Sequence, residues 1–319
     1  MRVYRRIKTA NQILNEGSVV NIGVFDGIHL GHQVLINRAI EKATELSLPS
    51  VVFSFEPTPN DYFAKNEKQL RLNSFRQKYN LIKEMGVNNL YVPPFDSKME
   101  ELDVDKFIDL HLLKNLNVKH LIVGDDFRFA KNKAGSIKEL EESAKINNFS
   151  VESISTVEIN SKRVSSTLIR KFLFNNEVEE VIKYLGNYYS IEGKVITGQQ
   201  LGRTIGVPTA NVDIGKLNIP LRGVFCVRVN IENYETQAYF GVANIGYKPT
   251  VEGKTLNLEV HILDDFDEDI YKSRIQVEFM TYLRGEKKFN GVDELKAQIN
   301  LDIKQAEEYL WDWTSGLIY

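Results

Sequence analysis

The sequence is poor in cysteine and has no long apolar run. Its one cysteine, Cys226, cannot form an internal disulfide, and it lies in the apolar run 224–227, which is typical of a buried strand. We therefore expect a packed, unreactive thiol. No apolar run approaches the ~20 residues that a membrane-spanning helix needs. Residues 1–8 are basic but no apolar core follows them, so we expect no secretory signal and a cytoplasmic protein.

The sequence also lacks a basic excess, since 40 Lys and Arg residues stand against 43 Asp and Glu residues, for a formal net charge of −3. This balance disfavours a general binder of nucleic acid. Local basic clusters can still hold the phosphates of a nucleotide. The chain of 319 residues is long enough for two domains of ordinary size. We find no internal repeat and no low-complexity segment.

Short apolar runs alternate with helical patterns over the first half of the chain. The expected strands are 19–25, 50–55, 89–92, 120–123 and 151–155. Apolar residues spaced three and four apart indicate helices over 33–46, 74–85, 104–115 and 136–147. This alternation implies crossover connections and a mostly parallel, doubly wound sheet of the Rossmann-like α/β class. Ligands of such sheets bind at the carboxyl ends of the strands, and the first strand ends at Phe25.

After about residue 184 the pattern changes to successive strands with short connections. We expect strands over 191–196, 223–231, 236–243, 255–263 and 275–282, followed by a helix over 292–311. This order indicates an antiparallel sheet or small β-barrel closed by a terminal helix. We therefore predict two domains, 1–184 and 185–319, although no Pro- or Gly-rich linker marks their boundary.

The segment 23–32, GVFDGIHLGH, joins the first expected strand to the first helix. Its glycines permit positive φ and a close approach of the backbone to a ligand. The start of the helix offers unpaired N–H groups and a positive dipole end, which suit phosphate. His29 and His32 are three residues apart, so both can face one bound anion. A metal pair or two structural histidines are the alternatives, but no HExxH motif or cysteine cluster supports a metal site.

This segment resembles the HxGH motif of the nucleotidyltransferase superfamily, and its ten-residue form is similar to the adenylyltransferase module of bacterial FAD synthetases. Residues 123–129 resemble that family's G-x-D-F-R-F-G segment, with Ala130 in place of its last glycine. Residues 163–170 are similar to its I-S-S-T-x-I-R element. Hydroxyls and arginines at a helix start can hold a pyrophosphate, or they form only a serine N-cap with solvated arginines. In 55–59, similar to F-x-P-H-P, Thr58 replaces histidine and receives no role.

The resemblance implies roles for several residues of this first half. His29, His32, Arg163 and Ser166 are expected to orient ATP and to stabilise the charge that develops during adenylyl transfer. The other residues expected to bind the cofactors are Gly23, Phe25, Asp26, Gly27, Gly31, Asp126 and Arg170.

Residues 198–211, GQQLGRTIGVPTAN, form the second motif. Three glycines and an arginine make a loop that can wrap phosphates through backbone N–H groups. Thr209 and Asn211 are alternate residues of an extended segment after Pro208, so they point the same way. Their oxygens are hard ligands of the kind that Mg²⁺ accepts alongside phosphates and water. From the residues alone, a glycine-rich turn before an edge strand is the simpler interpretation.

The run 202–211 resembles the G-R-x-x-G-x-P-T-A-N motif of riboflavin kinases, and further segments follow in that family's order. These are 223–225, 241–246, 248–250, 258–264 and 283–289. The resemblance implies a small antiparallel barrel that uses Mg²⁺ and ATP. Thr209 and Asn211 are then expected to bind Mg²⁺ and the ATP phosphates, Glu259 to be the catalytic base for the ribityl 5′-hydroxyl of the flavin, and Arg284 to lie near the flavin. The remaining expected cofactor-binding residues are Gly202, Arg203, Gly206 and Asn244.

Together the two sets of motifs predict a bifunctional enzyme of flavin cofactor synthesis. It would phosphorylate riboflavin to FMN and adenylylate FMN to FAD, using ATP both times, with no nucleic-acid or membrane partner. One alternative is a riboflavin kinase whose first domain is inactive or serves another phosphorylated acceptor. A second alternative is a non-catalytic flavin sensor. His261 shares a strand face with Glu259, but a structural role is an equal alternative, so it is left out of the catalytic set.

Overall fold

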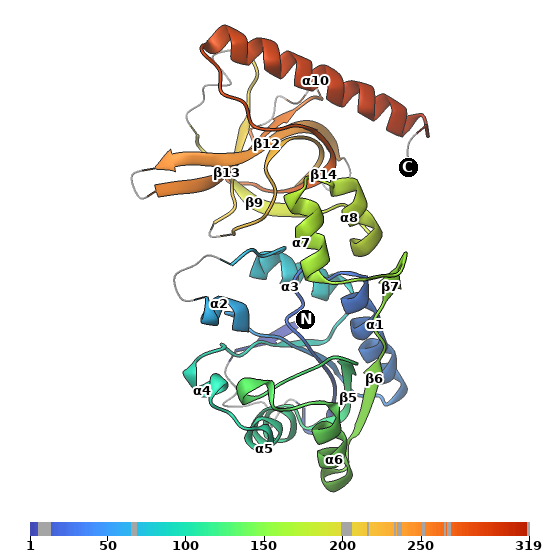
Figure 1. Ribbon diagram of the computed structural model, residues 1–319. Coiled ribbons are helices and arrows are strands. Elements are labelled where there is room, and N and C mark those ends of the chain that lie inside the picture. The colour runs from blue at the N-terminus through green and yellow to red at the C-terminus, as the bar shows by residue number, and fades with distance from the viewer. Residues whose placement is uncertain are drawn as a thin grey trace. The chain divides into compact units, whose positions relative to one another are not determined.

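The computed structural model divides into two compact units, Met1–Ser166 and Thr167–Tyr319, shown in Figure 1. It describes residues 1–5, 14–64, 69–198, 206–215, 217–232, 234, 238–250, 253–264, 266 and 269–317. The second unit takes in nearly all of helix α7 (Ser166–Phe174), which precedes the predicted boundary at 184/185, and helix α8 (Val178–Leu185), whose last residue lies just beyond it. That boundary was drawn between functional domains and stays a prediction.

The first unit contains a six-stranded sheet in the order β1-β4-β3-β2-β5-β6. Every neighbouring pair is parallel, which confirms the predicted doubly wound class. The strands are β1 Arg2–Tyr4, β2 Ser18–Ile22, β3 Ser50–Phe53, β4 Asn89–Tyr91, β5 Val118–Gly124 and β6 Ser150–Ile154. Strand β1 was not predicted, because three mostly exposed residues at the edge of a sheet carry no apolar period.

Helices cover both faces of this sheet. The helical segments are α1 Leu30–Glu45, α2 Pro59–Phe63, α3 Phe75–Glu84, α4 Ser97–Glu100, α5 Val104–Phe107, η2 Ile108–Asn115, η3 Lys131–Lys133 and α6 Ile137–Asn147. On one face Phe53 packs against Phe107 and Leu112, and on the other Val52 packs against Ile36 and Ile82. Successive strand residues therefore point to opposite layers. The predicted helix 104–115 exists, but from Ile108 onward it is a π-helix.

The second unit is a closed barrel of six antiparallel strands in the order β10-β13-β12-β11-β14-β9. The strands are β9 Ser190–Ile196, β10 Ala210–Asp213, β11 Gly223–Ile231, β12 Tyr239–Thr250, β13 Gly253–Ile262 and β14 Arg274–Arg284. Helix α10, Val292–Thr314, lies across the outside of the barrel (Figure 1). The predicted barrel and terminal helix are confirmed. The predicted strand 236–243 ended too early, because Asn244, Gly246 and Pro249 interrupt the apolar pattern of β12.

Side chains on the outer face of the barrel hold α10 in place. Val224, Cys226 and Met280 are buried there against Ala306 and neighbouring apolar residues of the helix. Cys226 is a buried free cysteine, as expected, and burial raises the pKa of its thiol to about 12. Within the part of the chain that the structure describes, no helix is long and apolar enough to cross a membrane.

A buried histidine provides a test of the first unit. His111 of η2 lies with its Nδ1 2.8 Å from the Tyr91 hydroxyl, which also accepts a hydrogen bond from the Asn115 side chain at 3.0 Å. Burial lowers the pKa of His111 to about 4, whereas an unfolded histidine titrates near ~6.5. The unfolded chain therefore binds this proton first, and stability falls as the pH drops from ~6.5 toward 4.

We expect this one histidine to remove about 3 kcal/mol of unfolding free energy between pH 7 and pH 4. Denaturant unfolding of the wild type and of His111→Gln at several pH values measures the difference, since every other histidine is present in both proteins. The wild type should lose more stability on acidification than the variant does. Parallel pH profiles for the two proteins would contradict the assignment.

Candidate active sites

The turn between β2 and α1, residues 23–29, has an unusual backbone. Phe25, Gly27 and Ile28 have φ values of 52°, 88° and 43°, so two residues other than glycine take the left-handed region. A Cβ added to Gly27 would lie 2.6 Å from Leu72 Cδ1, and one added to Gly23 would lie 3.0 Å from the Phe25 ring. The motif's glycines are therefore required by close packing as well as by conformation.

Asp26 fastens this turn to the loop that precedes α3. Its buried carboxylate accepts hydrogen bonds from the Leu72 N–H at 3.1 Å and from the Asn73 N–H at 3.3 Å. The Ser166 hydroxyl donates to the backbone carbonyl of Asp26 at 2.8 Å. Asp26 and Ser166 therefore act on the shape of the turn, and their expected contacts with a cofactor stay predictions.

The two histidines of the motif lie together at the start of α1. His29 is the N-cap residue, and its Nδ1 accepts the backbone N–H of His32 at 3.3 Å. The rings stack with centroids 3.6 Å apart, and Phe25 packs its edge against His32. Burial, His29 and Lys78 together lower the pKa of His32 well below its usual range. At neutral pH His32 is therefore uncharged. His29 caps the helix, which is the structural alternative given for the histidines above.

A Cβ added to Gly31 would lie 3.3 Å from the His29 ring, so this glycine lets the ring lie over the helix start. Arg163 of the hairpin β7 (Glu158–Ile159) and β8 (Lys162–Arg163) pairs with Asp126, which follows β5. Both side chains are more than half exposed. Arg170 lies on α7 in the second unit. The structure thus brings Arg163 and Asp126 together as an exposed ion pair beyond the carboxyl end of the sheet.

The two departures from the family pattern have local explanations. Thr58 is the N-cap of α2, with Asp61 completing a capping box, so a structural role accounts for it. Ala130 has φ 64° and ψ −178°, a backbone conformation that is almost restricted to glycine. Ala130 therefore adopts a conformation that suits glycine, the residue that the family pattern has at this position.

In the second unit, the strand register brings the expected kinase residues into one row. Asn211 of β10 is opposite Glu259 of β13, and Glu259 is opposite Asn244 of β12. Val224 of β11 continues the row, and Arg284 of β14 is its partner. Directly opposed residues of antiparallel strands point to the same face. Four residues from four different strands are thus aligned on the outer face of the barrel.

Thr209 borders two cavities of this unit. One, of about 140 Å³, is also lined by Asn244, Arg284 and Asp302. The other, of about 410 Å³, is also lined by Phe266 and Tyr271. Thr209 therefore lies in the wall of both cavities.

Arg284 is held by a carboxylate that the sequence analysis did not identify. Its Nε and Nη2 each donate to the Asp302 carboxylate at 2.7 Å, and Asp302 is a buried residue of α10. His261 points its Nδ1 at the Pro208 carbonyl oxygen, 2.7 Å away. Since a carbonyl only accepts, His261 donates this bond, which supports the structural alternative for it. Asp302 gave no sequence signal because acidic residues are common on an amphipathic helix.

The glycine-rich loop is described only at its ends. Gly202 and Arg203 lie outside the described residues, and Gly206 has φ 81°, the left-handed conformation that favours glycine. Asn211 is buried, and an added Cβ at Gly198 would collide with its side chain. In the described ranges no three His, Cys, Asp or Glu side chains gather as a metal site. Thr209 and Asn211 are therefore candidate ligands only for an ion that also binds phosphate and water.

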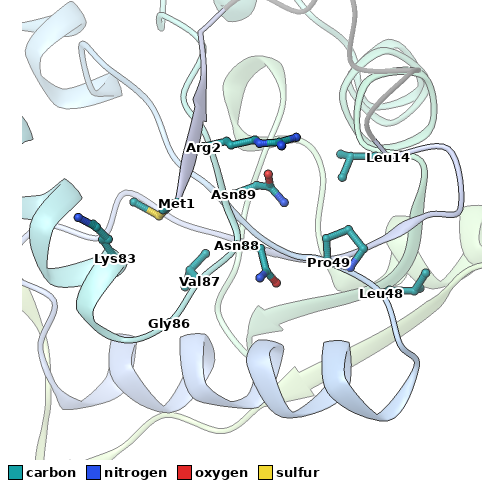
Figure 2. A pocket seen from close by; sticks show the side chains of 10 residues that line it. All are labelled: Met1, Arg2, Leu14, Leu48, Pro49, Lys83, Gly86, Val87, Asn88 and Asn89. Carbon is teal, nitrogen blue, oxygen red and sulfur yellow. The ribbon is translucent and has the colours of Figure 1, made fainter.

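A third cavity, of about 770 Å³, lies at the amino ends of β3 and β4. This edge of the sheet is opposite the turn of residues 23–29, which we call the histidine turn. Figure 2 shows Arg2 and Lys83 among its lining residues, with their charged ends pointing away from each other. Two cations that diverge do not make one anion site. Parallel sheets bind ligands at the carboxyl ends of their strands, so this cavity is separate from the turn and helix start that contain His29 and His32.

The chain matches two family models in succession, FAD synthetase over residues 11–168 and riboflavin kinase over residues 185–310. Three similar relatives carry the name bifunctional riboflavin kinase/FMN adenylyltransferase. The relative from Haemophilus influenzae is 38% identical over 97% of this chain and 99% of its own. That from Pseudomonas fluorescens is 40% identical over 92% and 93%, and that from Escherichia coli K12 is 38% identical over 97% and 98%.

A solved structure, a macrolide-efflux protein from Streptococcus pneumoniae, is also similar. It is 30% identical to this chain, covers 96% of it and 99% of its own length, and superimposes with a TM-score of 0.81. The two-unit architecture of this chain is therefore shared over almost the full length of a crystal structure.

The strained loop at Ala130 gives a prediction for stability. Ala130→Gly removes a backbone strain of about 1–3 kcal/mol from the folded state, which raises the free energy of unfolding. The greater freedom of glycine in the unfolded chain lowers the free energy of unfolding by about 0.5–1 kcal/mol. We expect the first unit to gain about 1 kcal/mol of unfolding free energy, measured by denaturant unfolding. Ala134→Gly, at a residue with ordinary helical φ and ψ in the same loop, is the matched control and should lower stability. If both changes destabilise the unit equally, the strain is absent.

Proposed function

Because the chain belongs to the family of bifunctional riboflavin kinases/FMN adenylyltransferases, we propose that the residues of its two motif sets divide two ATP-dependent reactions between them. The chain is an enzyme of flavin cofactor synthesis. Its C-terminal domain phosphorylates riboflavin to FMN, and its N-terminal domain adenylylates FMN to FAD. The observation that carries this function is the pair of family matches, one to each half of a chain that its relatives match almost end to end.

In the kinase reaction, the ribityl 5′-oxygen attacks the γ-phosphorus of ATP, and ADP leaves. Glu259 accepts the proton of the attacking hydroxyl. Its position between Asn211 and Asn244 in the strand register supports this role, since both amides can position the reacting groups around it. Arg284, held at two points by Asp302, borders the smaller cavity and orients the flavin there. Most of the acceleration comes from positioning and from stabilisation of charge.

The donor set of this site fits Mg²⁺ rather than a softer metal. Thr209 and Asn211 contribute one hydroxyl and one carboxamide oxygen, and the rigid, buried Asn211 side chain supports a ligand role. Mg²⁺ commonly takes few protein ligands and completes its shell with phosphate oxygens and water. When bound, the ion would neutralise part of the phosphate charge. Thr209 and Asn211 would hold it, and the glycine-rich loop that contains Gly202, Arg203 and Gly206 would wrap the ATP phosphates.

In the adenylyl transfer, an oxygen of the FMN phosphate attacks the α-phosphorus of ATP, and pyrophosphate leaves. The nucleophile is already an anion, so a strong general base is not needed. The backbone N–H groups at the start of α1, the positive end of its dipole and the side chains of His29, His32 and Arg163 stabilise the charge that develops. Ser166 fixes the turn through the Asp26 carbonyl. The substrates of the two reactions are thus riboflavin, FMN and ATP. The cytoplasmic location of the protein stays a prediction.

Product analysis tests both reactions in one protein. With riboflavin, ATP and Mg²⁺ the chain should form FMN and ADP, and with FMN, ATP and Mg²⁺ it should form FAD and pyrophosphate, as resolved by liquid chromatography. Pantetheine phosphate and glycerol phosphate in place of FMN are the acceptor controls and should give no adenylylated product. FMN formation without FAD above the blank would leave a kinase with an inactive first unit. Flavin binding with neither turnover would leave a sensor.

Replacement of Glu259 by Gln tests the base assignment. The substitution preserves size and removes the proton acceptor, so FMN formation should fall by about 10²- to 10⁴-fold, while FAD formation from supplied FMN stays unchanged. Glu307→Gln, an exposed carboxylate on α10, is the matched control. FMN formation at the wild-type rate in Glu259→Gln would show that the base lies elsewhere.

A further inference from the structure

Lys78 of α3 is a buried lysine that neither motif contains. Only 2% of its surface is exposed, although burial of an unpaired ammonium group normally costs several kcal/mol. Its Nζ donates a hydrogen bond of 2.7 Å to the backbone carbonyl of Val24 and lies 3.5 Å from the Ser54 hydroxyl. No ion pair between Lys78 and a carboxylate occurs among the described residues. A charged group in such a position needs an explanation.

The Val24 carbonyl is the point where the histidine turn begins. Lys78 and Ser54 both reach this carbonyl, since the Ser54 hydroxyl also donates to it, at 3.0 Å. The residues that follow, Phe25, Gly27 and Ile28, have positive φ. A backbone of this kind persists only when its surroundings fix it. Lys78 therefore contributes to the conformation of the segment that presents His29 and the start of α1.

The charge of Lys78 also reaches the histidine pair. The groups that lower the pKa of His32, beside its burial, are His29 and Lys78. The uncharged Phe25 ring packs against His32 in a T-shaped arrangement. Burial lowers the pKa of Lys78 itself, and Arg71 lowers it further, while Asp26, Glu56 and Asp61 raise it. The Asp26 carboxylate is already engaged by two backbone N–H groups. The carboxylates of Asp26, Glu56 and Asp61 therefore favour the charged form of Lys78, against its burial and the Arg71 charge.

We propose that Lys78 is a positioning residue of the adenylyl-transfer site, which holds the Val24 carbonyl beneath the histidine turn and places a buried positive charge behind the ATP polyphosphate. This inference rests on the proposed adenylyl transfer. A methionine of equal length would fill the same space without the cost of burying a charge, so packing alone does not account for a lysine. In a region of low dielectric, one such charge acts on an incoming polyanion more strongly than an exposed lysine does.

The test compares four variants of the full-length chain. Lys78→Met removes the charge and the donor, and Lys78→Gln removes the charge but keeps a donor for Val24. Ser54→Ala keeps the charge and removes the second hydrogen bond to that carbonyl, together with the 3.5 Å contact to Lys78 Nζ. Lys83→Met, an exposed lysine on the same helix, is the matched control. Riboflavin phosphorylation by the second unit, measured on the same samples, normalises the amount of active protein.

We expect kcat/KM for FAD formation to fall roughly 10- to 100-fold in Lys78→Met, the range seen when a group that supports a binding site is removed. The fall should arise from a higher KM for ATP and, in the reverse reaction, from a higher KM for pyrophosphate. The KM for FMN should stay unchanged. Lys78→Gln should be impaired nearly as much. Ser54→Ala, which keeps the charge and weakens only the support of the Val24 carbonyl, should lose less activity than Lys78→Gln. The Lys83→Met control should keep the kcat/KM of the wild type.

The pH profile supplies a readout that a purely structural role would not move. Without the Lys78 charge the pKa of His32 rises, so the acid limb of kcat/KM for FAD formation should move to higher pH in Lys78→Met. An unchanged acid limb together with wild-type KM for ATP would overturn the proposal. If Lys78→Met does not fold, Lys78→Gln decides the same comparison. A wild type that forms no FAD would refute the proposed function itself, which separates that failure from this one.

Discussion

The first unit depends on the set of hydrogen bonds that fix the turn between β2 and α1. The Asp26 carboxylate binds the backbone of Leu72 and Asn73, Ser166 binds the Asp26 carbonyl, and Lys78 binds the Val24 carbonyl. Each bond brings a segment distant in the sequence to one short loop. The positive φ values of the loop would not persist without them. The phosphate binding that we propose for the start of α1 therefore depends on contacts within the protein that fix this loop.

In the second unit, strand register fixes the positions of the expected site residues. Antiparallel pairing places Asn211, Glu259, Asn244 and Arg284 in one row, so the barrel itself sets their spacing. The Arg284–Asp302 pair then attaches this row to α10, whose apolar side covers the neighbouring outer face of the barrel. A shift of one residue in any pairing would turn the row toward the barrel interior. Fold and site are thus specified by the same apolar alternation.

The strong periodic segments of the sequence were sufficient to predict both architectures and most of their elements. Three of the misses have identifiable causes: β1 is too short to show a period, the end of β12 contains residues that are rare in strands, and the π-helix at Ile108 has the apolar spacing of an ordinary helix. The residues near the predicted sites that went unnoticed, Lys78 and Asp302, are charged residues on helices. Such residues are normally exposed, and only tertiary burial distinguishes these two.

The sequence by itself determined the two fold classes, and its resemblance to two enzyme families implied the chemistry of flavin phosphorylation and adenylylation. Local patterns are sufficient for this because periodicity and glycine-rich turns depend on neighbouring residues. Only the tertiary structure decided that the Asp26 carboxylate faces the backbone, that His32 is uncharged, that Ala130 takes a conformation suited to glycine, and that Lys78 lies beneath the histidine turn. Each of these depends on burial and on partners far away in the chain, and no local pattern encodes those distances.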